Sequence, residues 1–547
     1  MHLERIEVSN FRGIRRLSLT FDELTTLIGE NTWGKSSLLD ALTIMLPPSR
    51  ELYQLTRKDF HVDVAESQPL ARHCQIVLCF ASIDEKERQA GRYRRIKPLW
   101  CRGPDDQHRI YYRLSATQQP NGSITTRYDF LDNQGRIKVL TKSEVFAQEL
   151  MGLHPVLRLT DARRLPKEIK QQQAELSGNT RFEKRLENTC RRLMATPGHV
   201  NKGEIRASMQ AMSALVEHYF SFKSSSSFRS ASARGAVFRL PEAQGQSLSE
   251  IVKETKNPHT HLLFLRLMNT YLQAKGPHPL RRCARPIVII DDPEGRLHPT
   301  HLARAWSLLN RLPMQKILTT NSSDLISAVP LASIRRLVRQ QERTVARTMP
   351  TKGLSSDELR RIGFHLRFHR PGALFARCWL LVEGETEVWL FSEFARQLQY
   401  NLPAEGIQIV EFAQSGLRSM INVAQAFGIE WHVITDGDGA GKKYAHSVRS
   451  MLHHETPAHR LTELSERDIE HFLYMNGFES FFRDLVRIPT NHTISPPKVV
   501  TKVLKKFAKP DLALAIVSHT HQQGEHFIPT LIKVTLSRVV LMARAHL

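Results

Sequence analysis

Hydrophobic positions early in the chain follow the pattern of strands that lead into a helix. Short apolar runs at 6–8, 17–19 and Leu24–Ile28 are bounded by turn-forming or polar residues, and they predict strands. The apolar stretch Ser36–Leu46 predicts a helix that stops at 47–48, because the two prolines there cannot continue it. We therefore expect the chain to begin as part of an α/β domain.

The character of the chain changes between about 161 and 222. This stretch is charged, rich in glutamine and favourable to helices, so we expect a helical insertion there. The serine-rich segment 224–234 that follows predicts a flexible connection. Strand signals return at Pro286–Ile290 and Lys316–Leu318. We expect these strands to complete the sheet that the first residues begin.

A second α/β pattern starts at Cys378. The run Trp379–Val382 predicts a buried strand, a helical stretch follows to about Gln399, and Val433–Thr435 predicts another strand. The segment 487–547 has helical patterning and is basic, with nine lysines and arginines against two acids. The sequence thus predicts three parts, at 1–365, 370–485 and 486–547.

The net charge of the chain indicates a polyanionic partner. Lysine and arginine number 77 against 54 acids, which gives a net charge of +23 and an isoelectric point near 10. A basic surface that serves only solubility is the alternative, but solubility alone needs a much smaller charge. We therefore expect the protein to bind a polyanion.

Cysteine usage and the first residues bear on location. The six cysteines include no C-x-x-C pair, which argues against a disulfide framework and against a structural zinc site. Charged residues stand where a signal peptide would need an apolar core, and no apolar run approaches the roughly 20 residues of a membrane span. We expect a cytoplasmic protein without a membrane partner.

A phosphate-binding loop lies at Gly29–Ser36. Its sequence, GENTWGKS, matches G-x-x-x-x-G-K-[ST] and stands between a predicted strand and a predicted helix, which is the context that the motif requires. Glycines let backbone amides surround phosphates, Lys35 supplies a positive charge to the outer phosphates, and Ser36 offers its hydroxyl to magnesium. A glycine-rich turn without a ligand is the alternative, and it accounts poorly for a complete motif. The loop predicts ATP as a cofactor.

A carboxylate pair at a strand end is the second nucleotide-binding feature. Asp291 and Asp292 follow the apolar strand Pro286–Ile290, and a nucleoside triphosphatase needs a carboxylate there to hold its metal. The order of Asn10–Ile14, the phosphate loop, this strand and Thr319–Asp324 resembles the ABC-type heads of SMC, RecF and related DNA-repair ATPases.

That resemblance implies roles for individual residues. Asp291 would be the magnesium carboxylate beside Ser36, Asp292 would take the place of the catalytic glutamate, and Asn321 would replace the switch histidine. Because aspartate is shorter than glutamate and asparagine carries no proton, we expect slow hydrolysis, or ATP used mainly as a conformational clamp. A faint signature loop at 244–249 is equally compatible with an ordinary surface loop. The nucleotide-binding residues implied in this way are Arg12, Gly29, Asn31, Gly34, Lys35, Ser36, Ser37, Asp291 and Asn321.

Acidic residues follow two predicted strands of the second block. Glu383 ends the first of these strands and Glu387 lies about one helical turn further on, while Asp436 and Asp438 follow the later strand. Acidic ends of parallel strands converge at one sheet edge, and carboxylates at such density need cations between them, for which magnesium or manganese is suited. A solvated turn would explain the D-G-D run alone, but not together with the glutamate motif. A calcium loop is disfavoured because its twelfth position is Ser447.

The two acidic motifs resemble the Toprim domain of topoisomerases, primases and nucleases of the OLD (overcoming lysogenization defect) family. In these proteins the glutamate and the D-x-D aspartates bind catalytic divalent metal. The resemblance also implies that Glu470 is a downstream acidic ligand, with a solvent-facing helix carboxylate as the alternative. It implies a lysine that stabilises charge at the scissile phosphate, which we assign to Lys509 among the several lysines of that stretch.

An ABC-type ATPase followed by a Toprim domain on one chain is the architecture of the OLD family, and the resemblance covers nearly the whole chain. It implies an α/β fold with an ATPase head at 1–365, a helical dimerisation insertion at about 161–222, a Toprim nuclease domain at 370–485 and a basic helical segment at 486–547. It further implies an ATP-dependent or ATP-regulated DNA endonuclease, a homodimer, and a role in phage defence or DNA repair.

The resulting hypothesis is phosphodiester hydrolysis with two metal ions. Five carboxylates would hold the ions: Glu383, Glu387, Asp436, Asp438 and Glu470. The alternative is an ATP-gated DNA-binding or clamp protein of the RecF and SMC type, without nuclease activity. A topoisomerase is disfavoured, because nothing in the sequence resembles the separate tyrosine domain that such enzymes require.

Overall fold

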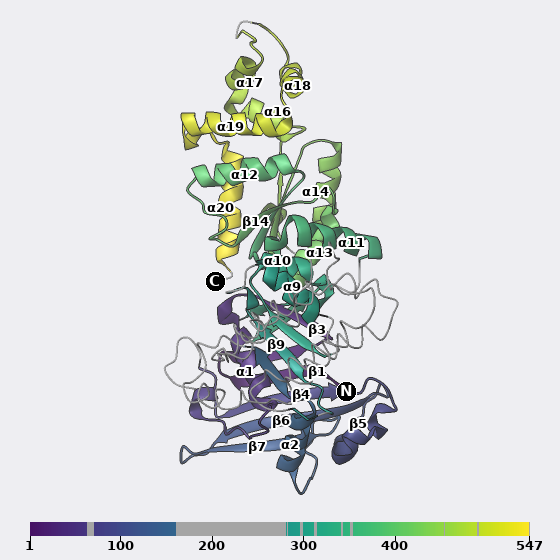
Figure 1. Ribbon diagram of the computed structural model, residues 1–547. Coiled ribbons are helices and arrows are strands. Elements are labelled where there is room, and N and C mark those ends of the chain that lie inside the picture. Colours follow the sequence, from purple (N-terminus) through teal and green to yellow (C-terminus); the bar gives the residue numbers. More distant parts are fainter. Residues whose placement is uncertain are drawn as a thin grey trace, which may run out of the picture. The chain divides into compact units, whose positions relative to one another are not determined.

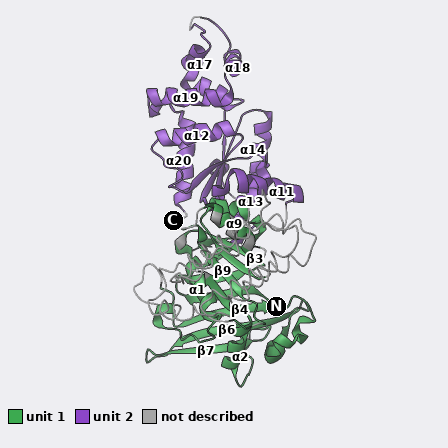
Figure 2. Cartoon of the chain, in the orientation of Figure 1, with its two compact units in different colours: residues 1–346 green, residues 347–547 purple. Residues whose placement is uncertain are grey.

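The computed structural model divides the chain into two compact units, Met1–Ala346 and Arg347–Leu547 (Figure 2). It describes residues 1–62, 71–159, 280–281, 283–295, 299–310, 314–340, 343–349, 354–452, 455–489 and 492–545. The predicted helical insertion at about 161–222 and the faint signature loop at 244–249 lie outside these residues. The three-part division expected from the sequence stays a prediction.

An antiparallel sheet forms one layer of the first unit. Its strands run in the order β2-β1-β4-β6-β5, and β7 pairs with β6. Ile6 and Val8 of β1 are buried and Glu7 between them is exposed, so this part of the strand has one face in the core. The strands are β1 (His2–Phe11), β2 (Ile14–Thr20), β4 (His73–Ala81), β5 (Cys101–Arg102), β6 (His108–Gln118) and β7 (Ile124–Leu131).

The second sheet of this unit carries the phosphate-binding loop. Its order is β12-β11-β3-β10-β9-β8, with β3 (Leu24–Ile28) at the centre, parallel to both of its neighbours. Strands β9 and β10 come from beyond the predicted insertion and join β3, which confirms that segments on both sides of it build one sheet. The first two predicted strands, β1 and β2, belong instead to the antiparallel sheet. The other strands are β8 (Val156–Leu159), β9 (Ile287–Asp291), β10 (Lys316–Thr319), β11 (Ile334–Arg339) and β12 (Thr344–Thr348).

Helix α1 (Lys35–Met45) contacts both sheets, through β1 and β8. Its inner face is apolar, with Leu38, Leu39 and Leu42 fully buried in the core that the two sheets share. The helix ends where the sequence predicted, at the residue before Leu46 and the two prolines. This packing fixes the helix N-terminus at the carboxyl edge of the parallel sheet, where open α/β sheets bind ligands.

The second unit contains a four-stranded parallel sheet in the order β14-β13-β15-β16. Helices α12 and α20 cover one face of it, and α13 and α14 cover the other (Figure 1). Every residue of β13 is buried, as its uninterrupted apolar run predicted. The elements are β13 (Cys378–Val382), α12 (Glu385–Gln397), β14 (Ile407–Glu411), α13 (Leu417–Phe427), β15 (Glu430–Thr435), α14 (Gly439–Met451), β16 (Leu461–Glu463) and α20 (Thr530–Arg544).

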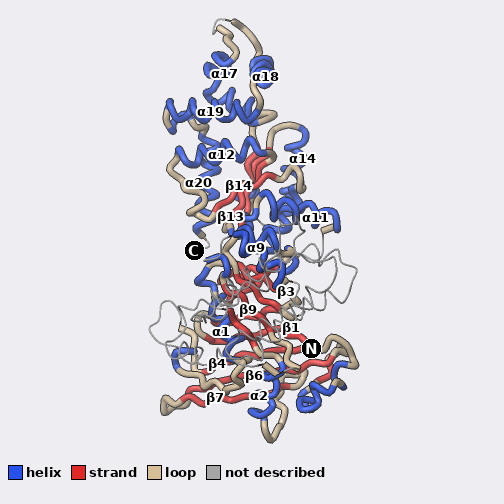
Figure 3. Tube along the Cα trace, viewed as in Figure 1, coloured by secondary structure: helices blue, strands red, loops and turns tan. Residues whose placement is uncertain are grey.

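The end of the chain is helical, as predicted, and it belongs to the same compact unit (Figure 3). Buried side chains of α18, α19 and α20, such as Val503, Ile516 and Leu536, share one core with strand β13. The helices are α16 (Ile469–Leu473), α17 (Glu479–Leu485), α18 (Pro496–Lys506), α19 (Lys509–Gln523) and α20. In the described part of the chain, no helix combines the length and the apolar character that a membrane span requires.

Candidate functional sites

The phosphate-binding loop joins β3 to α1 in the first unit. Gly34 has φ +91° and precedes the helix, and a Cβ there would lie 2.9 Å from Ile14 Cγ1, so both the conformation and the space require glycine. Lys35 is buried and its Nζ donates to Asn321 Oδ1 at 2.9 Å. Ser36 is exposed in the first helical turn, while Ser37 Oγ accepts from the amide of Gly13 at 3.1 Å. Of the remaining predicted residues, Gly29 directly follows β3 and Asn31 lies in the short helix η1 (Asn31–Trp33).

Carboxylates from the end of β9 and the turn after it act on this lysine. Burial lowers the pKa of Lys35, while the charges of Asp292, Asp291 and Glu294 act in the opposite direction. Asp292 has φ +46°, and Thr319 Oγ1 lies within 3.3 Å of its side chain and accepts from its amide at 3.0 Å. The structure therefore brings the predicted Lys35, Asp291, Asp292 and Asn321 to one sheet edge.

Glu294 joins this group, although the sequence did not mark it as functional. Its Oε1 accepts hydrogen bonds from the amide of Asn321 at 2.6 Å and from Thr320 Oγ1 at 3.0 Å. Its Oε2 is buried without a hydrogen bond. Glu294 thus ties the turn after β9 to the residue that takes the place of the switch histidine. The signal available in the sequence was its position two residues after the carboxylate pair.

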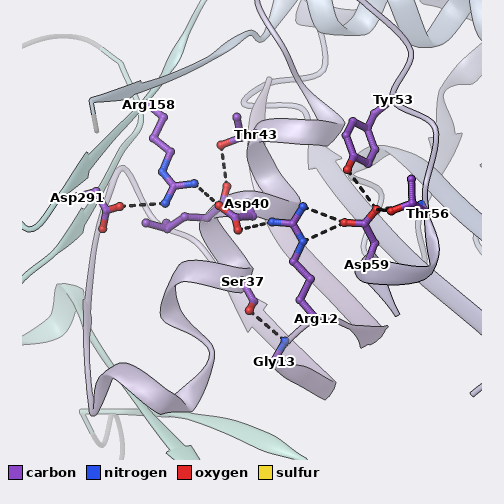
Figure 4. A network of polar contacts seen from close by, with 11 residues as sticks. Arg12, Gly13, Ser37, Asp40, Thr43, Tyr53, Thr56, Asp59, Arg158 and Asp291 are labelled. Atoms are coloured by element: carbon purple, nitrogen blue, oxygen red, sulfur yellow. Dashed lines mark hydrogen bonds and ion pairs between the residues drawn. The ribbon is translucent and has the colours of Figure 1, made fainter. Parts of the chain in front are cut away.

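A chain of ion pairs extends from Asp291 through the core of the first unit (Figure 4). Asp291 Oδ1 accepts from Thr319 Oγ1 at 2.8 Å, and its Oδ2 accepts from Arg158 at 2.9 Å. Arg158 also pairs with Asp40 of α1, and Asp40 pairs with Arg12. Arg12, which was predicted to contact nucleotide, is thus linked to helix α1 by its ion pair with Asp40. Arg158 and Asp40 could not be selected from the sequence, because their partners lie far away along the chain.

The predicted residue Arg12 is also held from the opposite side. Its Nε and Nη2 donate to Asp59 Oδ1 at 3.0 and 2.8 Å. Asp59 is buried, and its second oxygen accepts from Tyr53 at 3.1 Å and from the backbone and side chain of Thr56 at 2.9 and 3.0 Å. Burial acts to raise the pKa of Asp59, but these hydrogen bonds and Arg12 outweigh it and lower the pKa.

Replacement of Arg158 tests whether this chain of ion pairs acts on the metal carboxylate. We expect Arg158→Met to lower the magnesium concentration needed for half-maximal ATP binding several-fold, because the substitution frees Asp291 Oδ2 and removes a competing positive charge. The measurement is binding of a fluorescent ATP analogue across a magnesium titration. An unchanged or higher magnesium requirement in a folded variant would contradict the expectation.

Arg113→Met is the matched control for that experiment. Arg113 pairs with Asp129 at 2.7 Å between β6 and β7, and its side chain is 18% exposed against 14% for Arg158. Arg113→Met breaks one ion pair and Arg158→Met breaks two, so both substitutions should lower the Tm of the protein, Arg158→Met by more. Only the Arg158 variant should alter the magnesium dependence.

The second unit gathers carboxylates at the carboxyl edge of its sheet. Glu383 follows β13 and Asp436 follows β15, and these two strands are adjacent and parallel. Burial raises the pKa of Asp436 to about 8, and repulsion by Glu387 and Glu383 adds to the effect. Burial also raises the pKa of Glu383, with contributions from Asp438 and Glu387. The predicted convergence of the two acidic strand ends is confirmed.

Two of these carboxylates also hold the ends of helices. Glu387 is buried, and its Oε2 accepts from the amide of Gly384 at 3.2 Å at the start of α12. Asp438 is exposed and caps α14, because its Oδ1 accepts from the amide of Gly441 at 2.7 Å. A Cβ on Gly441 would lie 1.9 Å from the carbonyl oxygen of Asp436, so only glycine allows this close turn. Each carboxylate keeps a second oxygen for another partner.

Glu470 and Lys509 lie together beside the cluster. Glu470 is 2% exposed, so it is not the solvent-facing residue of the alternative interpretation. Lys509 Nζ forms an ion pair with its Oε1 at 3.3 Å. Burial raises the pKa of Glu470. Burial acts to lower the pKa of Lys509, but Glu470, Glu387 and Asp468 outweigh it and raise the pKa, so the lysine stays charged.

Asp468 and His471 complete the surroundings of Glu470, and sequence reasoning did not select them. Asp468 caps α16, and its Oδ1 accepts from the amide of His471 at 2.8 Å and lies 2.5 Å from His471 Nδ1. These hydrogen bonds lower the pKa of Asp468 although burial opposes them. The available signal was the D-I-E-H run itself, in which an aspartate stands two residues before the selected glutamate and a histidine directly after it, both residue types that can bind metals.

The donors of this edge fit a hard divalent cation by type and by charge. Glu383 Oε2 and Glu470 Oε2 are buried and accept no hydrogen bond, which is costly unless a cation or a donor approaches them. Among the described residues, no three carboxylate, histidine or cysteine side chains are arranged as a finished metal site. The cluster therefore has the type of oxygen ligand that magnesium and manganese prefer, but its side chains do not converge on a single ion position.

Comparisons with known proteins agree with this two-part organisation. Residues 1–373 match the family described as "Protein of unknown function (DUF2813)", and residues 374–438 match the "Overcoming lysogenization defect protein-like, TOPRIM domain". Fold and site thus define a protein in which a unit with a phosphate-binding loop precedes an OLD-like Toprim domain. The chain belongs to the DUF2813 family.

Individual relatives cover most or all of the chain. The uncharacterized protein YbjD of Escherichia coli (strain K12) is 41% identical over 554 residues, which is 100% of this chain and 99% of YbjD. The OLD nuclease of Thermus scotoductus is 23% identical over 468 residues, or 80% of this chain and 82% of that protein. The SMC head domain from Thermotoga maritima is 13% identical and covers 64% of this chain and 100% of its own, with a TM-score of 0.30.

Proposed function

We propose that this protein is an ATP-regulated, metal-dependent DNA endonuclease that hydrolyses phosphodiester bonds with two divalent cations. The observation that carries the proposal is the carboxylate cluster of the second unit, in which burial and neighbouring acids raise the pKa of Asp436 to about 8. Carboxylates with so strongly raised a pKa cluster at sites that bind a ligand or act in catalysis. The relationship to OLD-like proteins supports the nuclease reaction.

The proposed ligands of the cations are Glu383, Glu387, Asp436, Asp438 and Glu470. When bound, magnesium or manganese would supply an activated water and stabilise the leaving oxygen. The chain's own contribution is to hold the carboxylates at adjacent strand ends and to keep Lys509 charged beside them. A charged lysine in that place suits the negative charge that develops on a scissile phosphate.

The test is incubation of the purified protein with supercoiled plasmid and magnesium or manganese, with and without ATP. Metal-dependent conversion to nicked or linear DNA supports the proposal. Intact plasmid under all metal conditions would contradict it and would favour the clamp alternative. That alternative has one observation in its favour, since Thr319 and Arg158 hold both oxygens of Asp291, the proposed magnesium carboxylate of the head.

We also propose that DNA is the polyanionic partner and that the protein is a homodimer. The net charge of +23 supports DNA binding. The dimer is assigned to the predicted helical insertion at about 161–222, whose charged and glutamine-rich helices would pair between protomers. Deletion of 161–222 should convert a dimer to a monomer in light scattering at low protein concentration. A deletion variant that stays dimeric would place the interface elsewhere.

A further inference from the structure

The second unit has an exposed pair of aromatic rings, on residues that precede the carboxylate cluster along the chain. Helix α11 (Ser356–Phe364) continues into the π-helical turn η8 (His365–His369). Phe364 and Phe368 are each 56% exposed, and their ring centroids are 5.2 Å apart at an interplanar angle of 43°. Large apolar side chains exposed side by side mark a binding surface more often than isolated ones.

The segment that carries the rings is fixed to the unit from its inner face. Ser355 caps α11 and shares hydrogen bonds with Glu358, whose Oε1 accepts from Ser419 of α13 at 2.6 Å. Ile362 and Leu366 are fully buried on the inner side. Because the inner face is already occupied, the two phenylalanine rings cannot turn into the core.

Positive charge accompanies the rings. Arg360 and Arg361 are exposed one turn before Phe364, and the guanidinium of Arg367 lies 5.3 Å from the ring centroid of Phe368. The acids of the helix are engaged locally, since Asp357 pairs with Arg360 at 3.5 Å and Glu358 bonds the two serines. The outer face is therefore aromatic and basic at once.

We propose that Phe364 and Phe368 form a stacking platform for unpaired bases of single-stranded DNA. Arg360, Arg361 and Arg367 would bind the phosphates of that strand. This inference rests on the proposed DNA substrate and adds that the protein engages a strand with unstacked bases. Aromatic rings combined with arginines suit single-stranded DNA, because every base has a π face that can stack and every phosphodiester linkage carries a negative charge. An apolar protein partner would instead remove water from the guanidinium groups and supply no acceptors of its own for them, which is costly.

The test measures binding of a fluorescein-labelled 20-nucleotide oligo(dT) and of a 20-base-pair duplex to the full-length protein by fluorescence anisotropy. Phe364→Leu/Phe368→Leu keeps apolar bulk and removes both π faces. We expect this double variant to bind oligo(dT) about tenfold more weakly for each ring that stacks, and the duplex nearly unchanged. Phe364→Tyr/Phe368→Tyr should bind oligo(dT) as the parent protein does.

Leu514→Ala is the matched control, since Leu514 is 53% exposed on α19 of the same unit and lies outside the platform. It should leave both affinities unchanged. Oligo(dT) carrying 5-iododeoxyuridine should crosslink to peptides that contain Phe364 or Phe368. A leucine double variant that keeps its oligo(dT) affinity, or crosslinks that map only elsewhere, would overturn the platform.

Failure of the platform and failure of the proposed nuclease are distinguishable. A protein that nicks plasmid through Asp436 but binds oligo(dT) independently of both rings would overturn the platform and leave the nuclease standing. A protein that binds oligo(dT) through the rings but never nicks plasmid would support the platform and overturn the nuclease.

Discussion

Asp436→Asn should abolish metal-dependent nicking of supercoiled plasmid, with a loss of about 1,000-fold or more. A divalent cation contributes several kcal/mol to phosphodiester hydrolysis, and an amide in place of this carboxylate removes a central ligand of the cluster. The side chain keeps its size, so the fold is expected to persist. The measurement is the initial nicking rate in magnesium and in manganese. Retained cleavage by the folded variant would remove Asp436 from the mechanism.

The same substitution should stabilise the protein when no divalent cation is present. Asp436 has a pKa of about 8 in the folded chain against an ordinary 3.8, so folding favours its protonated form. The free energy of unfolding should therefore fall as pH rises from about 4 to about 8, and the charge-free variant should lose less of it. An increase of about 1 kcal/mol in the free energy of unfolding raises the Tm of a unit of this size by about 2–4 °C.

Thermal melts in EDTA between pH 5 and pH 8 check this, and added magnesium should restore stability to the parent protein alone. The matched control is Glu385→Gln, because Glu385 stands in the same V-E-G-E-T-E motif but is exposed. It should change neither the nicking rate nor the pH dependence of the Tm. A variant Asp436→Asn that melts below the parent at pH 8 without cations would show that the charged form of Asp436 does not destabilise the folded protein.

Lys35→Ala should lose about 10- to 100-fold in ATP affinity while basal nicking continues. The lysine supplies a charged hydrogen-bond donor to the outer phosphates, and such donors contribute about 1.5–3 kcal/mol. The carboxylates of the other unit lie on a different sheet and need no nucleotide to hold a cation. Regulation is then a shift between conformations, limited by the difference in ATP affinity between them.

The measurement is the nicking rate of parent and variant with no nucleotide, with ATP and with a non-hydrolysable analogue. Equal basal rates, with a nucleotide response only in the parent, support a regulatory head. A folded Lys35→Ala protein with no basal nicking under any metal condition would show that cleavage requires nucleotide. Ser36→Ala is a useful companion, because it should weaken the magnesium dependence of ATP binding more than ATP binding itself.

Adjacent strands of the two other sheets, β3, β9 and β10 in one and β13 and β15 in the other, could be predicted because their signals are local. Continuous apolar runs marked Ile287–Asp291 and Cys378–Val382, and each ends in residues with recognisable chemistry. The antiparallel sheet was not predicted beyond its first two strands. Strand β1 pairs with β4, more than sixty residues further on, and no local pattern specifies that partner.

The sites divide in a similar way. Residues in compact motifs, such as Lys35 and Glu383, could be selected from spacing, and the resemblance to known families added Glu470 and Lys509. Asp468 and Arg158 could not be selected, because their importance depends on partners that only the fold brings near. Lys509 illustrates the difference, since the sequence offered several lysines and the structure places this one 3.3 Å from Glu470.

The shared core of the second unit has a consequence for synthesis. Strand β13 and the acidic residues after it leave the ribosome well before α19 and α20, whose side chains complete that core. Until those helices arrive, the carboxylates lack both Lys509 and the packing that holds their strands. A translating ribosome therefore carries a chain whose acidic strand ends are made but whose carboxylate cluster is not yet assembled, and a chain that stops before α20 lacks part of the core that holds these strands.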